Sequence, residues 1–184
     1  HDRWLQALNK CTAKIQKAQT SNGSVAGNGW AGVLQSSFAT NALESAQHVG
    51  ADVDEKALEK ARDFQQGNFD ANTGSVATDA AAGVTLYAVS SSTRNSAKQA
   101  REVKEVMAKA RKEGKVKAEA PVTVETLLDA GMSRDDAEKA NTAYNVYEAA
   151  KVQAQSDNVV RGFGNNGGEE FLSFLQTGES LIIN

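Results

Sequence analysis

Residues 23–33, GSVAGNGWAGV, return almost unchanged as residues 74–84, GSVATDAAAGV. The second copy begins 51 positions after the first (74 − 23), and seven of the eleven aligned positions are identical. A segment that recurs at a fixed offset is typical of a fold built from tandem supersecondary units. We therefore expect two units of similar structure in the first half of the chain.

Each copy is expected to be a glycine turn between two helices. Before the first copy, apolar residues at spacings of three and four predict an amphipathic helix: Trp4, Leu8, Cys11 and Ile15. That helix should stop before Asn22-Gly23, because asparagine and glycine accept left-handed backbone angles. The pattern predicts a second helix over about 30–47. In the second unit, Asp54 is expected to cap a helix, the turn lies at 72–74, and another helix covers about 79–90.

Further helices are expected in the second half of the chain. A charged helix is predicted over 95–112, and the segment 115–122 around Pro121 is predicted to be a linker. A short helix from Thr123, a long one after Ser133 and a last one after a glycine-rich loop follow. The predicted organisation is 1–114 with both helix pairs and the charged helix, 115–122 as linker, and 123–184 as the C-terminal helices.

Composition favours helix throughout. The chain has 184 residues, 30 alanines and a single proline, and alanine loses no side-chain entropy when a helix forms. With 40% hydrophobic and 23% charged residues, a chain of this length can bury a real core. The predicted fold class is all-α, and the composition argues strongly against a β-sandwich or barrel.

Charge and hydropathy argue against a nucleic-acid partner and against a membrane-spanning segment. The formal net charge of −3 gives no basic field for a nucleic-acid backbone, so no nucleic acid is expected. The basic segment 98–119 is interpreted as a solvated helix face. The longest apolar run, 80–89, is about half the length of a membrane span, and no transmembrane segment is expected.

The spacing Ile15-x3-Gln19-x3-Gly23-x-Val25, followed by a helix of small residues, resembles the repeat of squalene cyclases and protein prenyltransferases. Phe64 with Gly74 resembles it more loosely, and the resemblance covers about residues 4–97. It implies repeated helix pairs forming part of an α/α toroid. The chain is too short for a closed toroid, so the expectation is a fragment, an open helical arc, or a subunit completed by association.

The chemistry of that family is not expected here. The nearest match to the cyclase acid motif, residues 52–55, should lie at a helix entrance without apolar surroundings to raise a carboxyl pKa. Cys11 and His48 match no zinc-ligand spacing. We therefore predict no catalytic residues, no metal ligands and no cofactor, and we lean against an enzyme.

Five residues are candidates for binding. Trp30, Phe38 and Tyr87 could line an apolar pocket for a lipid-like ligand, or could simply form core. Glu169 and Glu170 could form a polar patch at a cavity mouth, or could complement the dipole of the last helix.

The residue His1 leaves two readings open. A processed N-terminus would indicate an exported protein, periplasmic or extracellular, and its amine and ring could chelate copper together with His48. A boundary cut from a longer polypeptide would carry no such meaning, and localisation stays unknown.

The expected function is a non-catalytic helical-repeat module that binds a protein partner or self-associates. One alternative is a domain of an isoprenoid- or lipid-handling enzyme whose acid residues lie elsewhere. Another is a self-assembling filament or coat subunit, since an incomplete arc exposes apolar ends that a second copy could cover.

Overall fold

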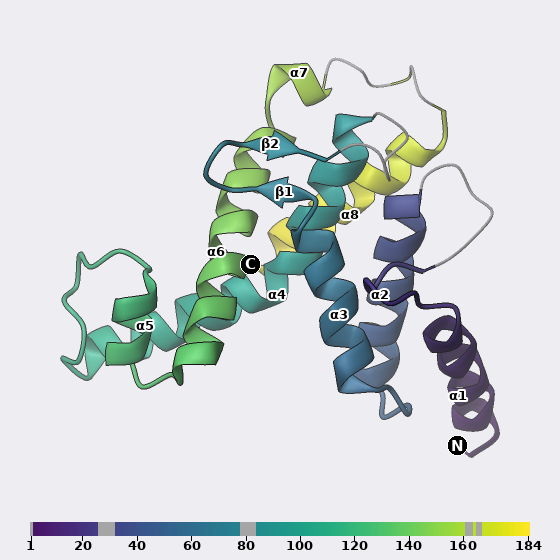
Figure 1. Cartoon of the computed structure of the whole chain (residues 1–184), viewed down its shortest axis with the longest axis horizontal. Coiled ribbons are helices and arrows are strands. Elements are labelled where there is room, and N and C mark those ends of the chain that lie inside the picture. Colours follow the sequence, from purple (N-terminus) through teal and green to yellow (C-terminus); the bar gives the residue numbers. More distant parts are fainter. Residues whose placement is uncertain (1, 26–31, 78–83, 161–163, 165–166) are drawn as a thin grey trace.

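The protein is predominantly helical, as Figure 1 shows for the computed structural model. The structure describes residues 2–25, 32–77, 84–160, 164 and 167–184. Within these residues the prediction of an all-α class is confirmed. The elements are α1 (Asp2–Lys17), α2 (Gly32–His48), α3 (Glu55–Gln66), β1 (Phe69–Asp70), β2 (Ser75–Val76), α4 (Thr85–Lys112), α5 (Val124–Asp129), α6 (Arg134–Ala154), α7 (Asp157–Val160) and α8 (Glu169–Ile183).

The two sequence copies begin in equivalent turns. Gly23 follows α1 with φ +92°, and Gly74 follows α3 with φ +67°, so both glycines occupy the left-handed region that the sequence predicts. In the second turn β1 and β2 form a short antiparallel ladder that pairs Phe69 with Val76, and in the first turn Gln19 and Val25 form an isolated bridge. These ladders were not predicted.

Helix α4 runs unbroken from Thr85 to Lys112, so the prediction of separate helices over 79–90 and 95–112 is wrong. The polar run 90–96 joins the two predicted helices. Its side chains instead bond to backbone carbonyls: Thr93 Oγ1 donates to Val89 O and Asn95 Nδ2 to Ser91 O, each at 2.8 Å. Such bonds one turn back satisfy polar side chains without interrupting a helix.

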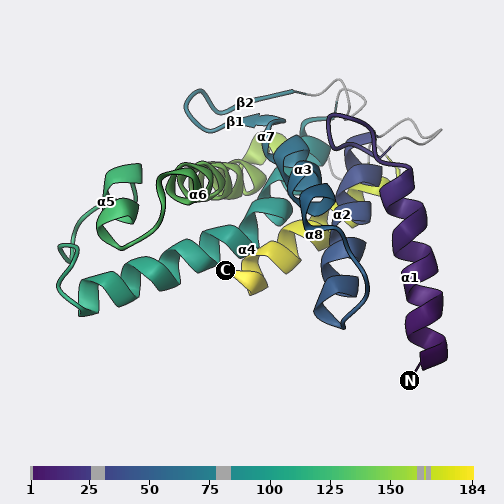
Figure 2. The ribbon, with the colours of Figure 1, turned by 60° about the horizontal axis from the view of Figure 1, so that its bottom comes forward.

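Helix α4 is the central helix of the molecule, and α6 and α8 both pack along it (Figure 2). Its N-terminal end joins α2 and α7 around the buried Val33, Leu34 and Tyr87. Its C-terminal end packs against α5 and α6 around Met107 and Leu127. Helices on both sides of the 115–122 segment therefore share one central element.

The helices of the second half begin where the capping residues predict. Thr123 caps α5 through a capping box with Thr126, and the Ser133 hydroxyl accepts the Asp136 N–H at the start of α6. Between these helices Gly131 has φ +103°. Each start therefore satisfies backbone N–H groups that would otherwise lack partners.

Helix α1 stands at one edge of the molecule and is mostly solvent-exposed (Figure 1). Among its described residues Thr12 alone is buried, and its hydroxyl donates to Asp52 O at 3.1 Å. Cys11 is exposed, which corrects its expected place on a buried apolar face. The described contacts of α1 include hydrogen bonds to the backbone of residues 52 and 54, just before α3.

The toroid or open arc stays a prediction. Ala31 and 82–83, the small residues expected to allow close stacking of the second helices, lie outside the described residues. Of the described helices, none combines the length and apolar character needed to cross a membrane.

Candidate functional site

Helix α8 carries four polar residues inward and several apolar residues outward, while Phe174 and Ile183 are half-buried and pack against the core. Glu170, Ser173, Gln176 and Ser180 are fully or almost fully buried. The opposite side, which we call the α8 face, consists of Phe171, Leu175, Gly178 and Ile182, all exposed. A helix on a protein surface usually has the reverse arrangement.

The inward side of α8 packs along α4. Helix α4 has fully buried serines of its own, Ser90, Ser91 and Ser92, and the Ser92 hydroxyl donates to Gln65 O of α3 at 2.9 Å. The hydroxyl of Tyr147, on α6, donates to Ser180 O at 3.4 Å. Gln176 is 1% exposed, yet neither of its amide atoms has a hydrogen-bond partner among the described residues.

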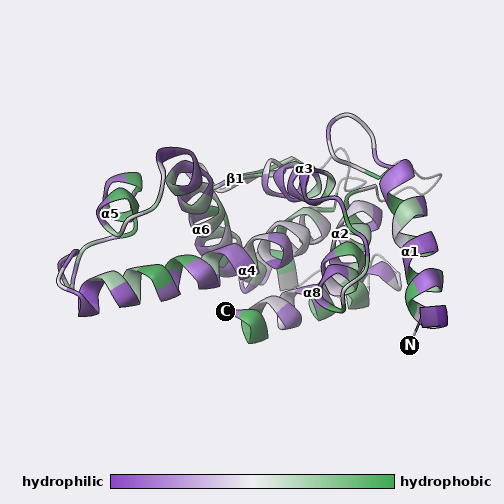
Figure 3. Ribbon diagram, turned by 90° about the horizontal axis from the view of Figure 1, so that it is seen from below, coloured by the Kyte–Doolittle hydropathy of each residue, from purple (hydrophilic) through white to green (hydrophobic). Residues whose placement is uncertain are grey.

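The α8 face exposes several large apolar side chains to solvent. Ile182 is 87% exposed, Phe171 61% and Leu175 54%, and Leu172 and Leu181 flank them. Figure 3 shows the hydrophobic C-terminal turn of α8 at the lower edge of the view. Several adjacent exposed apolar side chains, unlike scattered single ones, mark an interaction surface.

A groove of about 430 Å³ runs beside the α8 face, between α8 and α2. Apolar side chains line its α8 wall, and Arg94 of α4 and Glu179 of α8 bring charge to it. Asn41 also lines it, and its Oδ1 is buried without a hydrogen-bond partner among the described residues. The lining residues are Phe38, Asn41, Ala42, Ser45, Arg94, Glu179, Ile182 and Ile183.

A charge network fixes the four helices around this groove. Glu44 of α2 accepts from Arg62 of α3 at 2.6 Å and lies 3.4 Å from Arg94 of α4. Arg94 Nε also lies 3.1 Å from Glu179 Oε2 of α8. Because Arg94 and Glu44 are about nine-tenths buried, the pairs are screened little by solvent.

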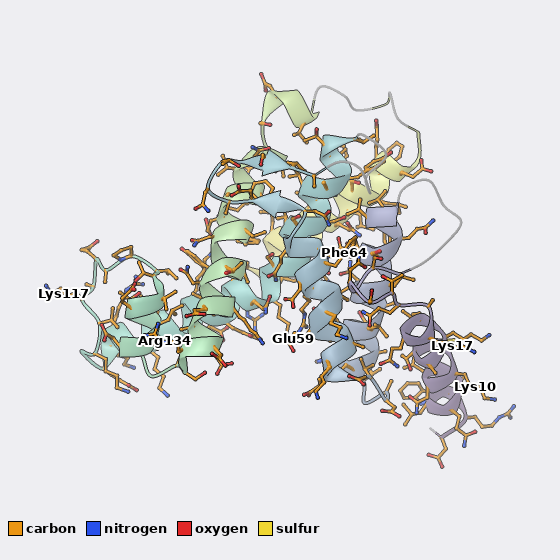
Figure 4. All side chains as sticks on the ribbon, in the orientation of Figure 1. Lys10, Lys17, Glu59, Phe64, Lys117 and Arg134 are labelled. Carbon is orange, nitrogen blue, oxygen red and sulfur yellow. The ribbon has the colours of Figure 1, made fainter. Side chains whose placement is uncertain are left out.

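A second cleft, of about 520 Å³, lies over α4 between α3 and α6. Charged side chains of both signs line it, and an ion pair between Lys139 and Glu59 crosses it; Figure 4 shows Glu59 between α3 and α6. Beside the cleft, burial and the neighbouring Glu59 raise the pKa of Asp63, against the opposing charge of Lys139. No group of three or more His, Cys, Asp or Glu side chains in the described part of the chain could hold a metal ion.

Of the residues predicted to bind a ligand, those that the structure describes do not share one pocket. Phe38 is half-buried and lines the groove between α2 and α8. Tyr87 is fully buried in the core beside Val33 and Leu34. Trp30 and His1 lie outside the described residues, and His48 is exposed at the end of α2.

Glu169 and Glu170 occupy the first turn of α8, as predicted. Glu169 is half-buried, whereas Glu170 is fully buried and accepts the Gly164 N–H. Burial, followed by the charges of Glu169 and Glu170, raises the pKa of Tyr87. The structure therefore brings these three predicted residues into one electrostatic neighbourhood, away from the α8 face.

The sequence does contain a signal for the α8 face. Phe171, Leu175, Gly178 and Ile182 follow spacings of four, three and four, which places them on one side of a helix. Ser173, Gln176 and Ser180 follow a matching pattern on the other side. Periodicity alone predicts that the apolar side is the buried one, which is wrong here.

Comparisons of the chain with models of protein families, with curated proteins and with solved structures found no match. The resemblance to the cyclase and prenyltransferase repeat therefore stays a prediction. The candidate site rests on the burial and contacts of this chain alone.

Proposed function

We propose that this protein is a helical binding or assembly module that uses the α8 face to bind another protein surface. The observation that carries the proposal is the reversed polarity of α8: four polar residues face the interior while Phe171, Leu175 and Ile182 face solvent. The helix-pair repeat would serve as scaffold, in an architecture similar to the cyclase and prenyltransferase repeat.

The free energy available from burying these apolar side chains supports binding. Fully burying a large apolar side chain contributes about 1.5–3 kcal/mol, and three such residues are more than half exposed. A partner that covered them would gain several times RT before the entropic cost of association. The scaffold under α8 is held by the Glu44, Arg62 and Arg94 network, so little ordering of α8 is needed on binding.

The chemistry of the face favours a protein over an anionic membrane. Helix α8 contains no Lys or Arg and has Glu169 and Glu170 in its first turn. Amphipathic helices that bind anionic lipid surfaces carry basic residues beside their apolar face. The expected partner is therefore an apolar protein surface.

Photo-crosslinking in the native source tests the proposal. A benzophenone amino acid replaces Ile182 in one variant and Val152 in another; Val152 is 67% exposed on α6 and serves as the matched control. We expect defined protein adducts from position 182 and few from position 152. Equal yields from both positions, or adducts with lipid only, would contradict the proposal.

A further inference from the structure

We infer that the outward side of α1 binds the surface of an anionic lipid membrane. This site lies on a different helix from the α8 face and does not depend on the proposed function. Three features of α1 carry the inference: positive charge on its outward side, an exposed apolar strip beside that charge, and attachment to the protein through another side of the helix.

The outward side of α1 is basic. Four basic residues of the helix, all exposed, share this side: Arg3, Lys10, Lys14 and Lys17. At 3.6 residues per turn they lie within about 60° of one another around the helix axis. Figure 4 shows Lys10 and Lys17 extending away from the other helices. Against the single acidic residue Asp2, four positive charges give α1 a net charge of +3, in a chain whose formal net charge is −3.

The charge on α1 is not neutralised by neighbouring carboxylates. None of its four basic side chains forms an ion pair within the described part of the chain. The basic segment 98–119 differs, because Arg101, Lys104 and Lys115 each pair with a glutamate. The basic side of α1 is therefore complementary to an external anionic surface.

An exposed apolar strip lies beside the basic side. Trp4, Ala7 and Cys11 are exposed, and their spacings of three and four align them along α1 next to Arg3 and Lys14. Trp4 also interacts within the chain, and 43% of its surface remains exposed. A basic surface alone would suit any polyanion, whereas tryptophan beside basic residues is typical of helices that lie in the headgroup region of a membrane. The strip therefore favours lipid over nucleic acid.

Helix α1 is attached to the protein through a different side. Asn9 Oδ1 accepts the Asp52 N–H at 2.9 Å, and Gln16 Oε1 accepts the Asp54 N–H at 2.7 Å. These bonds face the segment before α3, while the lysines face solvent. Because α1 stands at one edge of the molecule in both Figure 1 and Figure 2, a flat surface can meet its basic side without detaching the helix.

Co-sedimentation with lipid vesicles tests the inference. The full chain is mixed with vesicles of phosphatidylcholine alone or of phosphatidylcholine with phosphatidylserine, at low and high salt. We expect binding to the vesicles that contain phosphatidylserine, weakened by salt because ions screen the attraction, and little binding to phosphatidylcholine alone. No binding to the anionic vesicles, or equal binding to both kinds, would overturn the inference.

Charge variants locate the site. Lys10→Gln with Lys14→Gln should lower the partition coefficient for the anionic vesicles roughly 25-fold, at roughly fivefold for each charge removed beside the membrane. The matched control, Lys112→Gln with Lys117→Gln, also removes two exposed positive charges, but away from α1, and should lower it less than about twofold. Equal losses from the two pairs would overturn the assignment to α1.

Two further variants test the apolar strip and the α8 face. Trp4→Ala should lower the partition coefficient roughly fivefold with the helical circular dichroism retained, and unchanged binding would show attraction to any polyanion and overturn a lipid site. Ile182→Glu should bind vesicles like wild type. Loss of binding in Ile182→Glu but not in the lysine variant would place the lipid contact on α8 and overturn the inference.

Discussion

Gly23, the first residue of the repeated segment, packs very closely against the backbone of α3. Its φ is +92°, and a Cβ there would lie 2.0 Å from the carbonyl oxygen of Lys60 in α3. The corresponding Gly74 has φ +67° and lies against the side-chain amide of Gln153 in α6. In both turns, therefore, the glycine allows a left-handed backbone and a close approach by a following helix.

Replacing Gly23 by alanine should destabilise the fold. Gly50 is the matched control, because its φ is +87° but nothing lies within 4 Å of a Cβ there. Both variants incur the left-handed strain, and Gly23→Ala alone must also displace a backbone carbonyl, so it should cost about 1–3 kcal/mol more than Gly50→Ala. Urea unfolding measures the difference, and equal losses in the two variants would refute the close contact.

Glu44 of α2 forms ion pairs with residues of α3 and α4, so its replacement should destabilise the packing of all three helices. Because Glu44→Gln removes the negative charge shared by Arg62 and Arg94, both largely buried, we expect a loss of about 2 kcal/mol in the free energy of unfolding. The control, Glu105→Gln, breaks an exposed pair with Arg101 and should cost less than about 0.5 kcal/mol. Similar losses in chemical denaturation would show that the network contributes nothing.

Among the elements, α6 is tied to α4 by charge as well as by apolar packing. Glu148 of α6 lies 3.2 Å from Lys104 of α4 and 2.6 Å from Lys151. Both lysines also lie over the ring of Tyr147, at 5.5 and 5.2 Å from its centroid. Burial by itself would raise the pKa of Glu148, but hydrogen bonds from Lys151 and Lys104 outweigh burial and lower it.

The lowered pKa of Glu148 predicts a pH-dependent contribution to stability. A carboxyl whose pKa is lower in the folded state stabilises the fold above its unfolded-state pKa, and this contribution is lost as the pH falls through the folded-state pKa. Glu148→Gln should therefore lower the free energy of unfolding near neutral pH and have little effect at about pH 3. Denaturation of both proteins at the two pH values checks this, and an effect that does not depend on pH would exclude the ion pair as its source.

The elements also show what could be predicted from the sequence. Helix starts at Asp54, Thr123 and Ser133 follow from local capping chemistry, and they were predicted correctly. The continuity of α4 could not be predicted, because the polar run 90–96 is stable as helix only where α2, α3 and α8 bury it. The α8 face was missed for the same reason: a helix that buries serine and glutamine needs a polar neighbour such as α4, which periodicity does not reveal.

For the whole molecule, α4 joins the helices from both halves of the chain, and α8 lies along it with its apolar side outward. Polar residues are buried in both α4 and α8, among them Ser90, Asn95 and Gln176. Apolar surface that a single core would normally enclose lies instead on the α8 face. The molecule is therefore organised to present this face, and the account predicts that another protein surface covers it.

Recovery of bound proteins from the native source tests this claim most directly. Wild type should recover defined proteins, because their surfaces cover the α8 face. Val152→Glu, which changes an exposed apolar residue on α6, should recover the same proteins, and Ile182→Glu should lose them. Equal recovery by wild type and Ile182→Glu, or no protein recovered by wild type, would contradict the account.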